Sequence, residues 1–394
     1  MNALFLVATL VTAQDSADRW APMARALDSA IAARAFPGAV VVVGRHDTIL
    51  YQHAFGHLTY TDGPRAGGPT TRVTTRTVYD IASLTKVVGL TTAMMQLVEE
   101  GLVGLDTPAV RYVPAFHDST VTVRQLLTHS SGLPAWKPFF QSVRPGAGTL
   151  ARTAEIDSLR ARMFALVNAE PLEAAPGARM AYSDLGAMVL TQIVEHVMHE
   201  RIDRYVDIHL LRPLGMRDTR YRPPASWRSR IAPTERDTTY RHRLVHGEVH
   251  DENAWSMGGI SGHAGLFSTG PDLAKFAQLL LRTLRGERSP GYPDSATVTL
   301  FTRRDRPEFS SRALGWDTPS ENSSAGSQLS ARAFGHTGFT GTSIWIDPAQ
   351  DLFVILLTNR VYPTRENTQV FGVRREVADL AVELAGPRQG RGAR

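Results

Sequence analysis

The pattern of apolar and polar positions places strand-like segments near both ends of this 394-residue chain and helix-like segments between them. Residues 20–34 have helical spacing, and the apolar, β-branched segments 39–44 and 48–55 predict two strands joined by a polar turn. After a loop rich in Gly, Pro and Thr, the segment Tyr79 to Gly101 reads as one long amphipathic helix that ends at a glycine.

Helical patterns separated by Pro/Gly loops continue to about residue 250. Thr269 and Asp272 form a capping pair at the start of a further helix. Segments 342–346 and 352–358 predict a hairpin around "DPAQD", and a last helix covers about 369–384.

This order predicts an α+β fold in which one antiparallel sheet combines N- and C-terminal segments, is flanked by helices and carries an inserted helical region. We expect one domain over 20–385. Its α/β part would cover about 20–100 and 255–385, its helical part about 101–254, and a disordered tail would follow at 386–394.

The N-terminus resembles an export signal. An apolar run from Ala3 to Val11 ends in "VTA", which predicts a signal peptide over 1–13 with cleavage after Ala13. A buried N-terminal helix is the alternative. No other stretch is long enough to span a bilayer, so we expect a secreted or periplasmic protein without a stable membrane span after cleavage.

Composition excludes several classes of chemistry. Without cysteine, the chain has no thiol nucleophile, cysteine-ligated metal or disulfide framework. The net charge is +5, but the arginines are dispersed, and the densest stretch, 220–243, reads as a solvated loop, so we expect no nucleic-acid partner. Only three of the 43 basic residues are lysines. Because arginine keeps its proton in proteins, a retained lysine is a better candidate for a base.

Lys86 stands three residues after Ser83, on the same face of the predicted helix. A serine hydroxyl needs a neighbouring base to become a nucleophile, and a buried lysine can serve because desolvation lowers its pKa. Free N–H groups at the helix start favour an anionic intermediate there. Ser-x-x-Lys alone is a weak signal, since many helices carry it on a solvated face.

Two further motifs follow in order: "YSD" at Tyr182 to Asp184 and "HTG" at His336 to Gly338. Together with Ser83 and Lys86 they resemble the serine β-lactamase and penicillin-binding protein superfamily, in the class C-like branch with D-alanyl-D-alanine carboxypeptidases and class VIII-type esterases. The resemblance implies a β-lactamase/transpeptidase-like fold and an acyl-enzyme mechanism without cofactor or metal.

The resemblance also implies roles for individual residues. Ser83 would be the nucleophile, Lys86 would hold or share its proton, and Tyr182 would relay protons to the leaving group. The N–H groups of Ser83 and Phe339 would form the oxyanion hole. Substrate would dock against Asp184, His336, Thr337 and Gly338.

Two positions depart from the usual family pattern. Asp184 stands where asparagine is usual, and an anion there would raise the pKa of Lys86 and shift proton transfer towards Tyr182. His336 stands where lysine is commoner, which weakens the fixed positive charge offered to a substrate carboxylate. Both departures argue against an efficient β-lactamase.

The sequence therefore favours a D-alanyl-D-alanine carboxypeptidase-like peptidase acting on cell-wall peptides or another small molecule. The alternatives, in order, are a carboxylesterase of the same fold, a β-lactamase, and a catalytically silent ligand-binding or sensor protein. His242, His246 and His250 recur every four residues, but their polar, glycine-containing surroundings favour a structural role over a metal site. His250, Asp251 and His263 are expected beside the cleft, without an assigned role.

Overall fold

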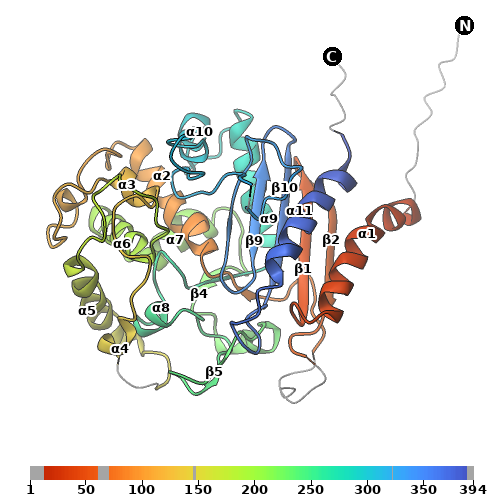
Figure 1. The fold of residues 1–394 in the computed structure, drawn as a ribbon, viewed down its shortest axis with the longest axis horizontal. Coiled ribbons are helices and arrows are strands. Elements are labelled where there is room, and N and C mark those ends of the chain that lie inside the picture. The colour runs from red at the N-terminus through yellow and green to blue at the C-terminus, as the bar shows by residue number, and fades with distance from the viewer. Residues whose placement is uncertain (1–12, 61–70, 145–147, 322, 388–394) are drawn as a thin grey trace, which may run out of the picture.

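The computed structural model describes residues 13–60, 71–144, 148–321 and 323–387. Its centre is a five-stranded antiparallel sheet with the strand order β2-β1-β10-β9-β8. The strands are β1 (Gly38–Arg45), β2 (Thr48–Gly56), β8 (Phe334–Thr337), β9 (Ser343–Asp347) and β10 (Leu352–Thr358). Figure 1 shows the red and blue strands of the two chain ends side by side, as the α+β prediction requires.

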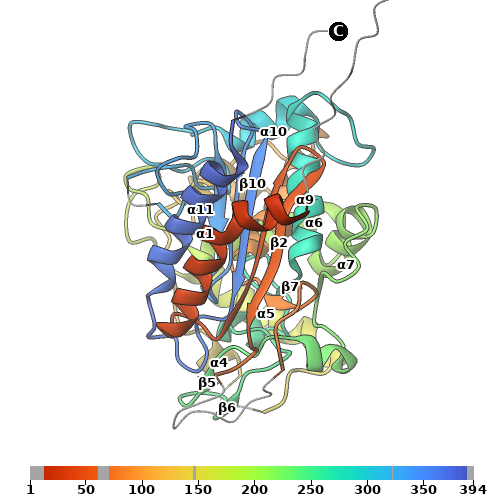
Figure 2. The same ribbon diagram turned by 90° about the vertical axis from the view of Figure 1, so that its right-hand side faces the viewer.

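Both faces of the sheet are covered by helices, which explains why β1 and β10 are apolar at nearly every position. In β1, Val40 and Val42 face the larger core, while Val41 and Val43 face a second core. Helices α1 (Ala13–Ala32) and α11 (Val370–Ala385) cover the second core and pack against each other (Figure 2). Helix α9 (Gly270–Leu284) covers the opposite face of β1 and β10.

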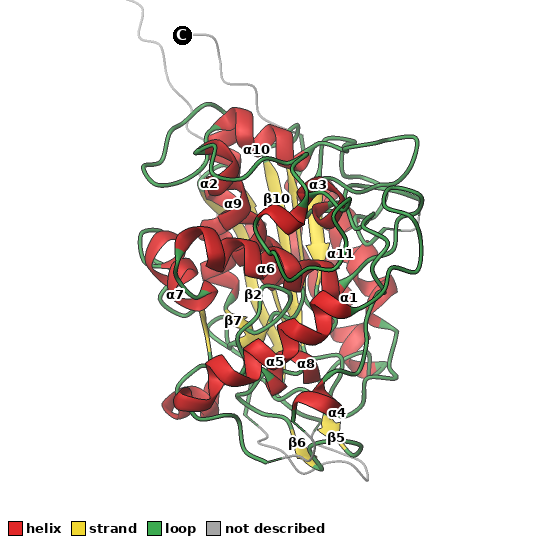
Figure 3. Ribbon diagram, turned by 90° about the vertical axis from the view of Figure 1, so that its left-hand side faces the viewer, coloured by secondary structure: helices red, strands yellow, loops and turns green. Residues whose placement is uncertain are grey.

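The remaining elements form the helical side of the molecule, seen in Figure 3. Its helices and short strands are α2 (Thr92–Glu99), α3 (Val123–Leu127), α4 (Phe140–Val143), α5 (Ile156–Ala169), α6 (Asp184–Met198), α7 (Ile202–Val206), α8 (Glu252–Ser256), α10 (Ser295–Thr302), β3 (Tyr79–Asp80), β4 (Arg220–Tyr221), β5 (Arg236–Asp237), β6 (Arg243–Leu244) and β7 (Leu266–Ser268). The region predicted to be helical thus also contains short strands.

The prediction of one amphipathic helix over Tyr79 to Gly101 is wrong in two respects. Tyr79–Asp80 is a strand paired with β7, and helical geometry begins only after Ser83, with a wide π-type turn over Lys86–Thr91 that continues into α2. This helix is buried on all sides down to Leu97, because it lies between the sheet and the helical side. Apolar residues around its whole circumference are the pattern of a central helix.

Most other element predictions agree with the structure to within a few residues, but the first helix, predicted to begin at residue 20, begins at Ala13. The Thr269 side chain accepts a hydrogen bond from the Asp272 N–H at the start of α9, and the C-terminal hairpin pairs β9 with β10. The predicted signal-peptide residues 1–12 and the tail from 388 lie outside the described residues. Within the described ranges, no helix has the length and apolar character needed to cross a membrane.

Candidate active site

Ser83 lies in a tight turn between β3 and the central helix. Ala82, immediately before it, has a φ of +45°, a left-handed conformation that costs an L-residue on the order of 1 kcal/mol or more. The buried Asp80 side chain stabilises the turn by accepting hydrogen bonds from the N–H groups of Ala82 (2.8 Å) and His250 (2.6 Å). The predicted nucleophile is therefore held by a fixed backbone at the N-terminal end of the helix.

Lys86 reaches back to Ser83, as the i, i+3 spacing predicts. Its Nζ lies 3.0 Å from Ser83 Oγ, 3.1 Å from the His263 carbonyl oxygen and 2.7 Å from Asp184 Oδ1. Three acceptors match the three donors of an ammonium group. Burial disfavours the charge on Lys86, but Asp184 and then Tyr182 outweigh burial and raise the pKa of Lys86 to about 12.

Tyr182 stands beside this ion pair, with its ring centre 4.9 Å from Lys86 Nζ. The ring also contacts the imidazoles of His129 (4.5 Å) and His336 (5.8 Å). Its hydroxyl is buried and has no hydrogen-bond partner among the described residues. A buried hydroxyl without a partner is costly, so this group is available for a proton-transfer role with substrate.

His336 and Thr337 end the edge strand β8, and Gly338 and Phe339 follow in the loop to β9. An added Cβ at Gly338 would lie 2.5 Å from the Ile81 carbonyl oxygen, so only glycine allows this loop to approach the Ser83 turn. Thr340 and Thr342 donate to the carbonyl oxygens of Asp80 and Ile81. The loop is thereby attached to the segment before Ser83.

His336 is a neutral side chain in this setting. Burial, followed by the charges of Arg312 and Lys86, holds the pKa of His336 well below its usual range. Its Nδ1 lies 2.8 Å from the Thr337 carbonyl oxygen, which can only accept, so Nδ1 carries the proton and Nε2 is an acceptor. Nε2 is buried and has no partner among the described residues.

A cleft of about 520 Å³ joins the predicted site residues. It is lined by Ser83, Tyr182, Asp184, His336, Thr337, Gly338 and Phe339, while Lys86 lies beneath it with 3% exposure. The backbone N–H groups of Ser83 and Phe339 make no hydrogen bond within the described ranges. The structure thus brings the three motifs together, and their individual roles remain predictions.

The motif analysis missed the arginines of the cleft: Arg312, Arg360, Arg365 and Arg374. Arg365 pairs with Glu235 and Glu252, whereas no carboxylate within 4.0 Å is found for Arg360 or Arg374 in the described structure. The sequence contains 40 arginines, and no sequence motif distinguishes these four from the others. One available signal was the position of Arg360, two residues after the end of the buried strand β10.

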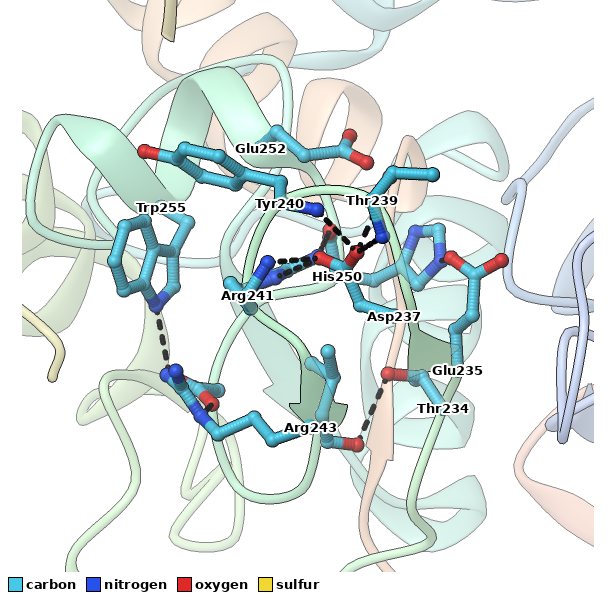
Figure 4. A network of polar contacts seen from close by, with 12 residues as sticks. Thr234, Glu235, Asp237, Thr239, Tyr240, Arg241, Arg243, His250, Glu252 and Trp255 are labelled. Atoms are coloured by element: carbon cyan, nitrogen blue, oxygen red, sulfur yellow. Dashed lines mark hydrogen bonds and ion pairs between the residues drawn. The ribbon is translucent and has the colours of Figure 1, made fainter. Parts of the chain in front are cut away.

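His250, Asp251 and His263 lie at the cleft as expected, and all three line it. His250 Nε2 is 3.1 Å from Glu235 (Figure 4), and Asp251 lies 2.9 Å from the buried His263 ring. The same wall holds the fully buried ion pair between Arg241 and Asp237. His246 instead contacts the carbonyl oxygens of Arg228 and Ile231, so the three regularly spaced histidines do not converge on one site.

Comparison with known proteins identifies relatives along most of the chain. A β-lactamase family model matches residues 23–379. A Salmonella typhi protein named "Putative D-alanyl-D-alanine carboxypeptidase" is 33% identical over 360 residues, which cover 85% of this chain and 81% of the relative.

Solved structures share the fold at lower sequence identity. An octameric penicillin-binding protein homologue from Pyrococcus abyssi has a TM-score of 0.67 at 22% identity, covering 95% of this chain and 78% of that one. EstCE1, a hydrolase with promiscuous acyltransferase activity, has a TM-score of 0.68 at 21% identity, covering 93% and 98%.

Proposed function

This chain belongs to the β-lactamase family of serine hydrolases, and we propose that it is a D-alanyl-D-alanine carboxypeptidase-like enzyme that forms an acyl-enzyme on Ser83. The substrate would be a cell-wall peptide with a free C-terminal carboxylate. One observation favours this activity over the other activities of the fold. The cleft contains an arginine with hydrogen-bond donors that lack protein partners.

Arg312 is that residue. Its Nε and Nη1 atoms are buried without a hydrogen-bond partner in the described part of the chain, and its nearest carboxylate, Asp317, is 3.9 Å away. The guanidinium lies 5.2 Å from the Tyr182 ring centre. Because His336 is neutral, it offers no positive charge to a substrate, whereas the Arg312 guanidinium does. A planar guanidinium with free donors suits a carboxylate.

In the proposed reaction, Ser83 Oγ attacks the carbonyl carbon of the scissile amide. Lys86 and Asp184 share one proton, and its transfer to Asp184 leaves a free amine on Lys86 that can accept the Ser83 proton. The N–H groups of Ser83 and Phe339 stabilise the oxyanion. Tyr182 delivers a proton to the leaving D-alanine amine and regains one from the Lys86 ammonium, which carries the proton taken from Ser83. Water then hydrolyses the ester and restores the Ser83 hydroxyl.

The test compares a substrate that carries a carboxylate with one that does not. We expect the enzyme to release D-alanine from an N-acyl-D-Ala-D-Ala peptide. Arg312→Gln should lower kcat/KM for this peptide by about 10- to 100-fold, in line with the loss of a charge-assisted hydrogen bond. Hydrolysis of neutral p-nitrophenyl acetate should change less than about threefold.

Arg306→Gln provides the matched control, because Arg306 is a partly exposed arginine outside the cleft lining. An equal loss on both substrates in Arg312→Gln would contradict the carboxylate role. Ester hydrolysis without any D-alanine release would indicate the carboxylesterase alternative.

We also propose that the protein is exported. Support comes from the apolar run Ala3 to Val11 and the "VTA" that ends it. N-terminal sequencing of the protein recovered from a periplasmic or culture fraction should begin at Gln14. An intact Met1 in a cytoplasmic fraction would contradict export.

A further inference from the structure

Three exposed aromatic side chains surround the mouth of the cleft. Seven large apolar side chains are exposed in the described structure, and the three aromatic ones, Trp136 (42%), Phe339 (49%) and Phe371 (52%), all line this one cleft. Isolated exposed apolar residues need no explanation, whereas a cluster at a concave site indicates binding. We call Trp136, Phe339 and Phe371 the aromatic rim.

Two of these rings share one cation. The Arg360 guanidinium lies 4.4 Å from the Phe339 ring centre and 5.9 Å from that of Phe371, and His250 lies 5.6 Å from Phe339. Arg360 donates to the carbonyl oxygens of residues 339, 365 and 367. Because Nε and Nη1 are both occupied by backbone carbonyls, the Arg360 guanidinium is held against the two rings.

Trp136 comes from the helical side of the cleft. It follows Ala135, whose carbonyl oxygen accepts a hydrogen bond from the Asp184 N–H (2.9 Å). Trp136 is therefore tied to the start of α6, while Phe339 and Phe371 come from the β8–β9 loop and α11. Rings from three separate parts of the chain meet at one cleft that also contains Ser83.

We propose that the aromatic rim binds the acyl half of the substrate and takes an apolar acyl group, such as an aliphatic chain or the side chain of an apolar D-aminoacyl residue. This assignment rests on the proposed acylation of Ser83. Arg312 takes the carboxylate of the leaving group, and the rim takes the other half. Each buried methylene then contributes binding energy equal to about a fourfold gain in affinity.

The experiment measures kcat/KM for p-nitrophenyl acetate, butyrate, hexanoate and octanoate. In the wild type, we expect kcat/KM to rise by about two- to fourfold per methylene until the rim is filled. Phe371→Ala and Trp136→Ala should at least halve the slope of log kcat/KM against chain length. Leu102→Ala and Ile208→Ala are controls, since both side chains are exposed outside the cleft.

A slope that is the same in all five proteins would overturn the rim assignment and leave the proposed hydrolase intact. A wild type that hydrolyses none of the esters would overturn both. A binding readout separates the cases further, because octanoate should quench fluorescence in Ser83→Ala but not in Ser83→Ala combined with Trp136→Phe. Equal quenching in both proteins would also count against the rim.

A second, independent observation concerns the buried Arg374 on α11. Its Nη2 donates to the carbonyl oxygens of Gly338 (2.6 Å) and Thr342 (2.8 Å). The Gly338 carbonyl belongs to the same peptide unit as the Phe339 N–H. In a trans peptide these two groups point in opposite directions, and the one cis bond in the described ranges is at Pro363.

We infer that Arg374 is a positioning residue, which holds the Gly338 carbonyl and thereby turns the Phe339 N–H towards the reacting carbonyl. The charge of Arg374 faces that of Arg360, and no carboxylate pairs with either arginine in the described structure. The positive charge of these two arginines therefore also stabilises a developing oxyanion beside Phe339. Burial, followed by the charge of Arg360, lowers the pKa of Arg374 to about 9.

Arg374→Ala should lower kcat by about 10²- to 10³-fold and change KM by less than threefold, as expected for a lost oxyanion donor. Affinity for an alkylboronic acid, which forms a tetrahedral anion on a serine, should fall by a similar factor. Millimolar methylguanidine should restore part of kcat. An unchanged kcat would overturn the assignment. So would a variant that fails to fold, if methylguanidine restores neither its activity nor its thermal melting transition.

Discussion

The two sides of the cleft differ in how their positive charges are balanced. On the side of the nucleophile, Lys86 meets the Asp184 carboxylate at 2.7 Å and also donates to Ser83 and to a backbone carbonyl. On the strand side, Arg374 and Arg360 donate only to backbone carbonyls, and Arg312 retains unpaired donors.

This difference assigns separate tasks to the two sides. A balanced lysine–carboxylate pair can exchange one proton without a change in net charge, which suits the step that activates Ser83. Buried guanidinium groups without a carboxylate partner keep their protons at neutral pH and act as fixed positive charges, which suits a tetrahedral oxyanion and a substrate carboxylate. We therefore expect different residues to perform the proton transfer and the charge stabilisation.

The largest expected effect comes from removing the exchangeable proton on the nucleophile side. Lys86→Arg keeps a positive charge near Asp184 but cannot supply a base. We expect kcat/KM for p-nitrophenyl acetate to fall by about 10²- to 10⁴-fold, close to the level of Ser83→Ala. Lys86→Met is the control for lost charge, and substantial activity in the arginine variant would contradict proton exchange at this position.

Asp184→Asn should leave the positive charge of Lys86 without a carboxylate partner and shift the pH dependence of kcat/KM. Asp184 raises the pKa of Lys86, so its removal lowers that pKa and increases the fraction of free amine at neutral pH. The ascending limb of the kcat/KM profile against pH should move to lower pH by about one unit or more. An unmoved limb would show that the Lys86 proton does not control acylation.

A smaller effect is expected at the ion-pair network beside the cleft. There Glu235 contacts His250 (Figure 4) and also pairs with Arg365. Although burial opposes it, bonding to His250 and Arg365 lowers the pKa of Glu235 to about 2. Because this pKa is depressed in the folded protein, the stabilisation is present above the usual glutamate pKa and is lost as pH falls through about 2.

Glu235→Gln should therefore lower the free energy of unfolding at pH 7 by about 2 kcal/mol, less than for a fully buried pair because Arg365 is 37% exposed. Chemical denaturation at several pH values provides the measurement. The difference between the two proteins should shrink as the pH approaches 2, and a constant difference would contradict the ionic origin of the effect.

The sequence predicted the parts of this molecule that depend on local patterns. The strands at both ends, the cap at Thr269 and the spacing of Ser83 and Lys86 follow from side-chain periodicity and hydrogen-bonding groups. The anion at position 184 also predicted the raised pKa of Lys86, because the resemblance placed both residues in one site.

What could not be predicted depends on contacts between distant segments. Arg312, Arg374 and Phe371 reach the cleft from a loop and from α11, and no local pattern distinguishes them from other residues of their type. The prediction of an amphipathic helix over Tyr79 to Gly101 implied a solvent-facing side. In the structure Gln96 is buried and contacts Tyr205 and a backbone carbonyl.

The most direct test of the account is to identify the acylated residue. The protein and Ser83→Ala are each mixed with benzylpenicillin or p-nitrophenyl acetate, quenched in acid within the first turnover, and compared by intact mass and peptide mapping. The account predicts a single acyl adduct on the peptide that contains Ser83, and none in the variant. An adduct on another residue, or undiminished ester hydrolysis by Ser83→Ala, would contradict it.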